Sequence, residues 1–371
     1  MAQNFDKWWN DLKKHRKRLD HWLRHARDLS QRQVGQRPLR YFTLCARPMI
    51  DVFLLAQEQL LNREDQHGRI LDVSFCELNQ EHYPEIIELL GVEGAGFPCD
   101  LEKLVLFKDD DYTGQFPTVE SIQSEIDLQG EGLDPTKRDQ LVLKRQHFDF
   151  RGKFPFDFLN LDFCEHYYPD PPGILEINET IQSIVNLQAK SIRVGQMDFG
   201  EFILSVTCRY DDGIPAAAFT RLEHIITNNK VNSPEYLNAM KETKGTDDAH
   251  AWRNENLYDF FVSAWPKEIL SIARDEGWSV QIKDLVHYDR VADDGRQYKM
   301  VCLVALFSRP GNQDNYVPQV VRTLRPDSRT FIDEIELDSE EGMILLENLR
   351  AIVAVRNDRA EIVGRPLLPD P

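Results

Sequence analysis

Carboxylates follow three of the apolar runs that the sequence predicts as buried strands. Glu77 follows the second run, Asp109 and Asp110 follow the third, and Asp162 lies at the end of the fourth. The carboxyl ends of parallel strands meet at one edge of a sheet, so we expect these acids to lie there together. Grouped carboxylates could bind a metal ion for nucleic-acid hydrolysis. The Glu-x-Lys spacing common in such nucleases follows none of the predicted strands, and we therefore predict no metal site.

Nucleophilic chemistry has one candidate, Cys164, which follows the fourth apolar run with His166 beside it. Cytosine-C5 chemistry uses a cysteine within a Pro-Cys dipeptide, which is absent here, so an inert thiol and a structural histidine are the simpler interpretation. The six cysteines form no CxxC pair, which argues against a zinc site and favours a reducing, cytoplasmic compartment. The chain has no GxxxxGK[ST], GxSxG, HExxH or GxGxxG motif.

Strand and helix patterns alternate through the middle of the chain. The predicted strands are 40–46, 70–76, 101–107, 156–163 and 201–208, and the predicted helices are 49–61, 81–90, 177–192 and 216–228. Near-continuous apolar strands separated by helices indicate a mostly parallel sheet that is covered on both faces. Right-handed crossovers make such a sheet doubly wound. Residues 111–152 are polar and are predicted to be an insertion or exposed loop.

The last third of the sequence departs from this alternation. A helical pattern over 257–276 is interrupted by Pro266 and ends at Gly277. Two strand patterns, 278–288 and 298–308, then follow with no helix between them, and their connection contains the Asp-Gly signal of a hairpin. We therefore expect an antiparallel hairpin at the end of the sheet.

This order of elements resembles the class I, Rossmann-like, S-adenosylmethionine-dependent methyltransferases, whose seven-stranded sheet ends in such a hairpin. The resemblance covers residues 40–310 and lies in element order rather than in motif letters. It implies an α/β fold with a doubly wound, mostly parallel seven-stranded sheet and S-adenosylmethionine as the cofactor. It also suggests a microbial subgroup of methyltransferase-like proteins found beside genome-defence or DNA-processing genes.

The resemblance assigns cofactor roles to four residues. The first strand should run into a glycine-rich turn, where bare backbone approaches the ligand. The matching turn, Cys45-Ala46-Arg47-Pro48, has no glycine, although Arg47 could face an anionic group of the ligand. Glu77 corresponds to the acid that accepts both ribose hydroxyls, and the alternative is a solvated glutamate at the end of the strand. Asp109 or Asp110 corresponds to the acid near the adenine amine, and the alternative is a solvated turn.

The resemblance also points to a catalytic set after the fourth strand. Nucleic-acid amino-methyltransferases carry an Asp- or Asn-Pro-Pro-aromatic motif there, which accepts hydrogen bonds from the target amine and stacks on the base. Asn160, Asp162 and Phe163 have the matching chemistry but lack the prolines. The glycine-free turn and the missing prolines both argue against ordinary cofactor chemistry.

Charge separates the amino-terminal segment from the rest of the chain. Residues 1–40 contain eleven Lys or Arg and four Asp, a net charge of +7, which leaves −25 for the remainder of a chain whose total is −18. Apolar residues at helical spacing predict a basic amphipathic helix in an extension over residues 1–39. Its cations could bind nucleic acid or an acidic partner, or they could be solvated while the tryptophans pack on the body.

Two function classes remain open from the sequence. The first is a non-catalytic scaffold or recognition subunit of a larger, nucleic-acid-related complex of the defence type, bound to a protein partner. The second is a divergent methyltransferase that acts on nucleic acid or protein. The acidic body argues against a whole-surface nucleic-acid or membrane binder, and we expect no signal peptide or membrane span. Residues 311–371 are predicted to be an appendage that packs on the sheet domain or on a partner.

Overall fold

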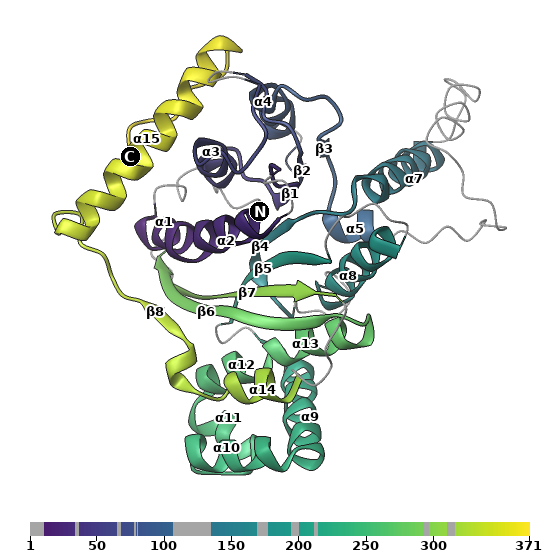
Figure 1. Ribbon diagram of the computed structural model, residues 1–371, viewed down its shortest axis with the longest axis vertical. Coiled ribbons are helices and arrows are strands. Elements are labelled where there is room, and N and C mark those ends of the chain that lie inside the picture. The colour runs from purple at the N-terminus through teal and green to yellow at the C-terminus, as the bar shows by residue number, and fades with distance from the viewer. Residues whose placement is uncertain are drawn as a thin grey trace.

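The computed structural model describes residues 11–33, 37–64, 68–77, 79, 81–106, 135–168, 177–193, 200–210, 214–291, 297–309 and 316–371 (Figure 1). The strands are β1 Tyr41–Leu44, β2 Val73–Cys76, β3 Gly96–Phe97, β4 Phe158–His166, β5 Glu201–Arg209, β6 Ser279–Val291, β7 Gln297–Ser308 and β8 Thr330–Ile332. The helices of the amino-terminal half are α1 Leu12–Lys17, the π-helix η2 Arg18–Leu23, α2 Arg24–Arg32, α3 Ile50–Gln57, α4 His82–Leu90, α5 Leu101–Val105, α7 Pro135–Lys153 and α8 Ile177–Arg193. Those of the carboxyl-terminal half are α9 Ala216–Asn232, α10 Pro234–Lys244, α11 Ala249–Glu255, α12 Leu257–Ala264, α13 Pro266–Asp275, α14 Tyr316–Arg322, the 3₁₀ turn η5 Pro326–Ser328 and α15 Glu340–Ile362.

The described strands form one mixed sheet in the order β3-β2-β1-β4-β5-β7-β6-β8. The pairs from β3 to β5 are parallel, β7 is antiparallel to both β5 and β6, and β8 is parallel to β6. The α/β class, the mostly parallel sheet and the antiparallel hairpin are therefore confirmed. The sheet has eight strands rather than seven, because β8 from the carboxyl-terminal region pairs with β6.

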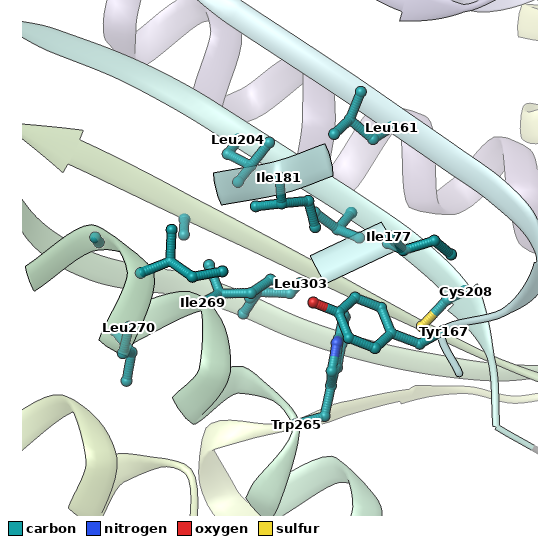
Figure 2. Close-up of a cluster of buried hydrophobic side chains, with 14 of the residues drawn as sticks. Leu161, Tyr167, Ile177, Ile181, Leu204, Cys208, Trp265, Ile269, Leu270 and Leu303 are labelled. Carbon is teal, nitrogen blue, oxygen red and sulfur yellow. The ribbon is translucent and has the colours of Figure 1, made fainter. Parts of the chain in front are cut away.

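Helices cover the sheet on both faces, and a separate apolar core fills each interface (Figure 1). Residues of η2, α2–α4 and α15 pack on one face, and residues of α5 and α7–α14 pack on the other. Figure 2 shows the second core, in which Leu161 and Leu204 of the strands meet Ile181 of α8 and Ile269 of α13. Side chains alternate along β7, where Cys302 belongs to the first core and Leu303 to the second, as a doubly covered strand requires.

The predicted third strand, 101–107, is wrong. Residues Leu101–Val105 form helix α5, and the strand at that position is the two-residue β3. The side chain of Asp100 caps the helix by accepting a hydrogen bond from the backbone N–H of Glu102 at 3.3 Å. Leu101, Leu104 and Val105 are buried at helical spacing, so the apolar run that resembled a strand is one face of a short helix.

One further segment differs from the sequence-based expectation, and the carboxyl-terminal region agrees with one of its two predicted placements. The predicted loop over 111–152 contains helix α7 from Pro135 onward, because Leu141 and Phe150 turn toward the core. The carboxyl-terminal region packs on the sheet domain through β8 and through α15, which contacts α1, α3 and α4. Within the part of the chain that the structure describes, no helix is both long and apolar enough to cross a bilayer.

Candidate functional site

The candidate site lies where β1 and β4 are neighbours. The next two strands in sequence, β2 and β3, extend the sheet on one side of β1, and β4 and β5 extend it on the other. Ligands of doubly wound sheets bind beyond the carboxyl ends of the strands at such a switch point. The β1–α3 turn, the end of β2 and the end of β4 meet there.

The β1–α3 turn is closed by side chains rather than opened by glycine. The backbone N–H of Met49 donates to the carbonyl of Ala46 at 2.9 Å, and Met49 adopts a left-handed conformation with φ 53°. Its side chain is 1% exposed within the first core, and the Cys45 thiol is also buried. A bulky residue at positive φ costs about 1–2 kcal/mol, which the burial of its side chain offsets. A cofactor-binding turn needs exposed backbone, and here packed side chains fill that place.

Arg47 binds a carboxylate of the protein itself. Its Nε donates to Glu85 of α4 at 2.9 Å, and the other oxygen of Glu85 accepts from Arg356 of α15 at 2.6 Å. Glu85 is 6% exposed, and Arg356 is fully buried. Burial lowers the pKa of Arg356, and Glu85 opposes that shift. The bridge Arg47–Glu85–Arg356 thus ties the first turn to the carboxyl-terminal helix.

Asn160 belongs to a buried polar network that begins on α3. The carboxylate of Asp51 accepts from Tyr41 Oη at 2.6 Å and from Thr43 Oγ1 at 2.9 Å. Asn160 Nδ2 donates to Tyr41 Oη at 3.0 Å and lies 3.3 Å from the same oxygen of Asp51. Asn160 is 1% exposed, so the network fixes α3 against β1 and β4 in the interior.

Asp162, two residues further along β4, binds cations of the amino-terminal helix. Lys14 Nζ lies 2.8 Å from Asp162 Oδ2, and the fully buried Lys17 Nζ lies 4.0 Å from the same oxygen. Lys17 also donates to Thr207 Oγ1 of β5 at 3.1 Å. Burial alone would raise the pKa of Asp162, but the charges of Lys14 and Lys17 outweigh burial and hold that pKa below its usual range. Burial lowers the pKa of Lys17, and Asp162 opposes this.

Phe163 and Glu77 contact other parts of the protein. Phe163 packs against the second core, on the opposite face of the sheet from the α1–α3 helices. Glu77 accepts a hydrogen bond from the backbone N–H of Asn79 at 2.7 Å and so caps the turn after β2. Asp109 and Asp110 lie outside the described residues. The structure therefore brings Asn160 and Asp162 together and separates them from Phe163.

Sequence reasoning missed the amino-terminal side of this site. The basic helix lies on the sheet with Trp22 and Leu29 buried, and its cations bind acids of the body. The pairs are Lys13–Glu334, Lys14–Asp162, Arg16–Glu341, Arg24–Asp284, Arg27–Glu58 and Arg32–Glu201, and beyond the helix Arg37 pairs with Asp157. Trp22 packs on the body, as one of the two interpretations of the sequence proposed, but the cations that this interpretation left solvated are paired with acids. The π-helical winding of η2 left no signal in the sequence, and such turns are frequent at functional sites.

Metal chemistry finds no support in this geometry. Across the residues with described positions, no group of three or more His, Cys, Asp or Glu is arranged to hold a metal ion. The described cysteines, Cys45, Cys76, Cys99, Cys208 and Cys302, are free thiols. Burial raises the pKa of Cys45 well above its usual value, with Asp51 and Glu77 adding to the shift, so that thiol is a poor nucleophile.

Comparison with known proteins found no protein-family model, no curated protein and no solved structure that matches this chain.

Proposed function

We propose that this chain is a methyltransferase-type α/β protein that acts without cofactor chemistry, as a scaffold or recognition subunit of a larger complex. One observation carries the proposal. Every described polar side chain predicted to hold cofactor or substrate is engaged within the protein: Arg47 by Glu85, Glu77 by the backbone of Asn79, Asn160 by Tyr41, and Asp162 by Lys14.

The strand order supports the methyltransferase-type part of the proposal. The order β3-β2-β1-β4-β5 is that of doubly wound dinucleotide-binding sheets. The antiparallel β6–β7 hairpin beyond β5 is the feature by which the sequence resembles class I methyltransferases. The eighth strand, β8, is an addition to that plan.

Free energies favour the scaffold over the enzyme. A ligand carboxylate at Arg47 would have to displace Glu85, which is also the partner of the buried Arg356. Breaking a buried ion pair costs about 3–5 kcal/mol. A ligand of micromolar affinity gains about 8 kcal/mol in total, so this single rearrangement would consume a third or more of it.

The charge pattern favours a protein partner over nucleic acid. The cations of the amino-terminal helix that could have bound phosphates bind Asp162, Asp284 and other acids of the same chain. A nucleic acid at that helix would compete with these carboxylates and would leave them uncompensated. The association with a defence-type complex follows only from the family resemblance.

One observation favours a second candidate, a divergent methyltransferase acting on an amino group of nucleic acid or protein. The Oδ1 atoms of Asn160 and Asp162 are buried and accept no hydrogen bond from any group in the described residues. Two acceptors on one face of β4, beside the switch point, would suit a target amine. This candidate requires the amino-terminal helix to move away, because Lys14 and Lys17 lie at Asp162.

Calorimetric titration of S-adenosylmethionine and S-adenosylhomocysteine into the protein separates the two candidates. We expect no heat of binding at millimolar ligand for the wild type, for Glu77→Ala or for the control Glu81→Ala, an exposed acid at the start of α4. Micromolar binding that is lost in Glu77→Ala and kept in Glu81→Ala would overturn the scaffold proposal and establish the divergent enzyme.

A further inference from the structure

Large apolar side chains are exposed mainly at the carboxyl-terminal helix. Of the nine that are strongly exposed among the described residues, five belong to α15 or its flanks: Leu337, Met343, Ile344, Ile362 and Leu367. Leu337 is 63% exposed, Met343 52% and Ile344 59%. Single exposed apolar residues are ordinary, whereas a group of them indicates an interaction site.

A tight turn holds Leu337, Met343 and Ile344 at one end of α15. The carbonyl of Glu336 accepts from the backbone N–H of Ser339 at 3.1 Å, and Ser339 caps the helix through Gly342 N–H at 2.9 Å. A Cβ on Gly342 would lie 2.1 Å from that carbonyl oxygen, so the turn packs directly on the first helical turn. These three apolar side chains form what we name the 337–347 patch.

The segment that carries the patch is rich in carboxylates. Between Arg329 and Arg350 the chain has seven Asp or Glu and no Lys or Arg. Glu334 and Glu341 form ion pairs with Lys13 and Arg16 of α1. The other five, which form no ion pair within the described chain and are all exposed, are Asp333, Glu336, Asp338, Glu340 and Glu347. The patch is therefore apolar at its centre and negatively charged at its rim.

The outer face of α15 continues the patch. The inner face packs on α3, α4 and α1 through residues such as Leu349 and Ile352, whereas Ala351 and Ala354 point outward and are exposed. Small side chains let a second helix approach closely. Figure 1 shows α15 at the periphery of the molecule, with its outer side facing away from the sheet.

We infer that the 337–347 patch docks an amphipathic helical segment of a partner protein, one with an apolar stripe flanked by Lys or Arg. The apolar stripe covers Leu337, Met343 and Ile344, and the flanking cations meet the five rim carboxylates, which steer the association. A second copy of this chain fits poorly, because a symmetric contact would bring the same carboxylates together. The inference rests on the proposed scaffold function and names the surface and partner chemistry that this function uses.

The test uses a synthetic peptide as the probe. A fluorescent amphipathic peptide of about 18 residues (roughly five helical turns), with leucine on one face and lysine on its flanks, is titrated with the full-length protein and followed by anisotropy. The comparison peptides are one with glutamate in place of lysine and one with the same composition in scrambled order. We expect only the amphipathic lysine peptide to bind, and more weakly at high salt because the rim contacts are exposed.

Protein variants test whether the peptide binds at the 337–347 patch. Met343→Ser/Ile344→Ser should weaken peptide binding about tenfold or more, equal to about 1.4 kcal/mol. Ile362→Ser is the matched control, because Ile362 is equally exposed at 59% on the same helix outside the patch, and it should bind like the wild type. Equal binding by Met343→Ser/Ile344→Ser, or equal binding of the scrambled peptide, would overturn the inference.

Two further outcomes distinguish failure of the partner assignment from failure of the scaffold function. Dimerisation of the wild type in analytical ultracentrifugation, lost in Met343→Ser/Ile344→Ser, would assign the patch to a second copy and overturn the partner assignment. Cofactor binding in the calorimetric titration would overturn the scaffold function alone, since that site lies at the β1 turn and the peptide result is measured separately.

Discussion

The ammonium of Lys14 lies 2.8 Å from the carboxylate of Asp162, so the amino-terminal helix places a cation at the residue that follows Asn160 on the same face of β4. Asp162 is thereby an anchor for that helix. The family resemblance had assigned it to catalysis. The pair also shows how a strongly basic segment is held on an acidic body.

Replacing Asp162 should destabilise the protein strongly. We expect Asp162→Asn to lower the free energy of unfolding at pH 7 by about 3–5 kcal/mol, because Lys17 would remain buried without its counter-charge. The pKa of Asp162 is depressed in the folded state, so its contribution is present above its ordinary value near 4 and is lost as pH falls below it. Urea unfolding should therefore show a smaller difference between variant and wild type at pH 3. An equal difference at both pH values would show that charge is not the cause.

The two left-handed residues that flank α3 should respond oppositely to glycine. Met49→Gly removes a fully buried side chain, and we expect a loss of about 2–4 kcal/mol even after the relief of backbone strain. Gln59, at φ 59° just after α3, is exposed, and Gln59→Gly should gain about 0.5–1 kcal/mol. Denaturant unfolding of both variants measures this. A gain in Met49→Gly would mean that the turn is not packed as described.

Replacing Glu85 should lower the free energy of unfolding more than replacing its partner Arg47. Glu85→Gln leaves the buried Arg356 without a counter-charge, and we expect a loss of about 3–5 kcal/mol. Arg47→Ala removes a half-buried partner and should cost about 1 kcal/mol. Hydrogen exchange should locate the effect, with protection lost in α15 for Glu85→Gln and retained for Arg47→Ala. Unchanged protection of α15 in Glu85→Gln would contradict the bridge.

Because of His15, the protein should lose stability at a pH above the range in which carboxylates titrate. Burial is the main cause that lowers its pKa to about 3, with Arg18 adding to it and the hydrogen bond to Asn348 opposing it. A folded-state pKa below the ordinary value of about 6.5 means that stability is lost as pH falls below 6.5, by about 2 kcal/mol between pH 7 and pH 5. His15→Gln should lose less over this range than the exposed control His224→Gln. Parallel losses in the two variants would remove His15 as the cause.

The strands that are buried on both faces could be predicted from the sequence. The short elements α5 and β8 could not. The continuous apolar run of β5 was predicted to be a doubly covered strand, and it is one. Residues 101–107 were equally apolar, but the cap at Asp100 and the spacing of Leu101, Leu104 and Val105 select a helix. The three residues of β8 are too few for any periodicity to identify them.

The candidate site was predictable in position but not in its partners. Arg47 and Glu77 do lie just after the carboxyl ends of β1 and β2, as strand order implied. Asn160 and Asp162 instead lie within β4, which continues to His166, and Asn160 is paired with Thr43 of β1. Which groups bind them depends on helices remote in sequence, such as α1 with Lys14 and α15 with Arg356. Helical periodicity indicates that a face is buried, but it does not indicate which carboxylate an individual cation will meet.

The pairing of α1 with α15 has a consequence for synthesis of the chain. His15 bonds to Asn348 and Lys13 to Glu334, so the first core closes only when the last helix arrives. Roughly 320 residues separate the two helices, and at about 5–20 residues per second a ribosome needs roughly 15–65 s to make them. During that interval the outer sides of α3 and α4 are uncovered, and the nascent protein should depend on chaperones that shield apolar surface.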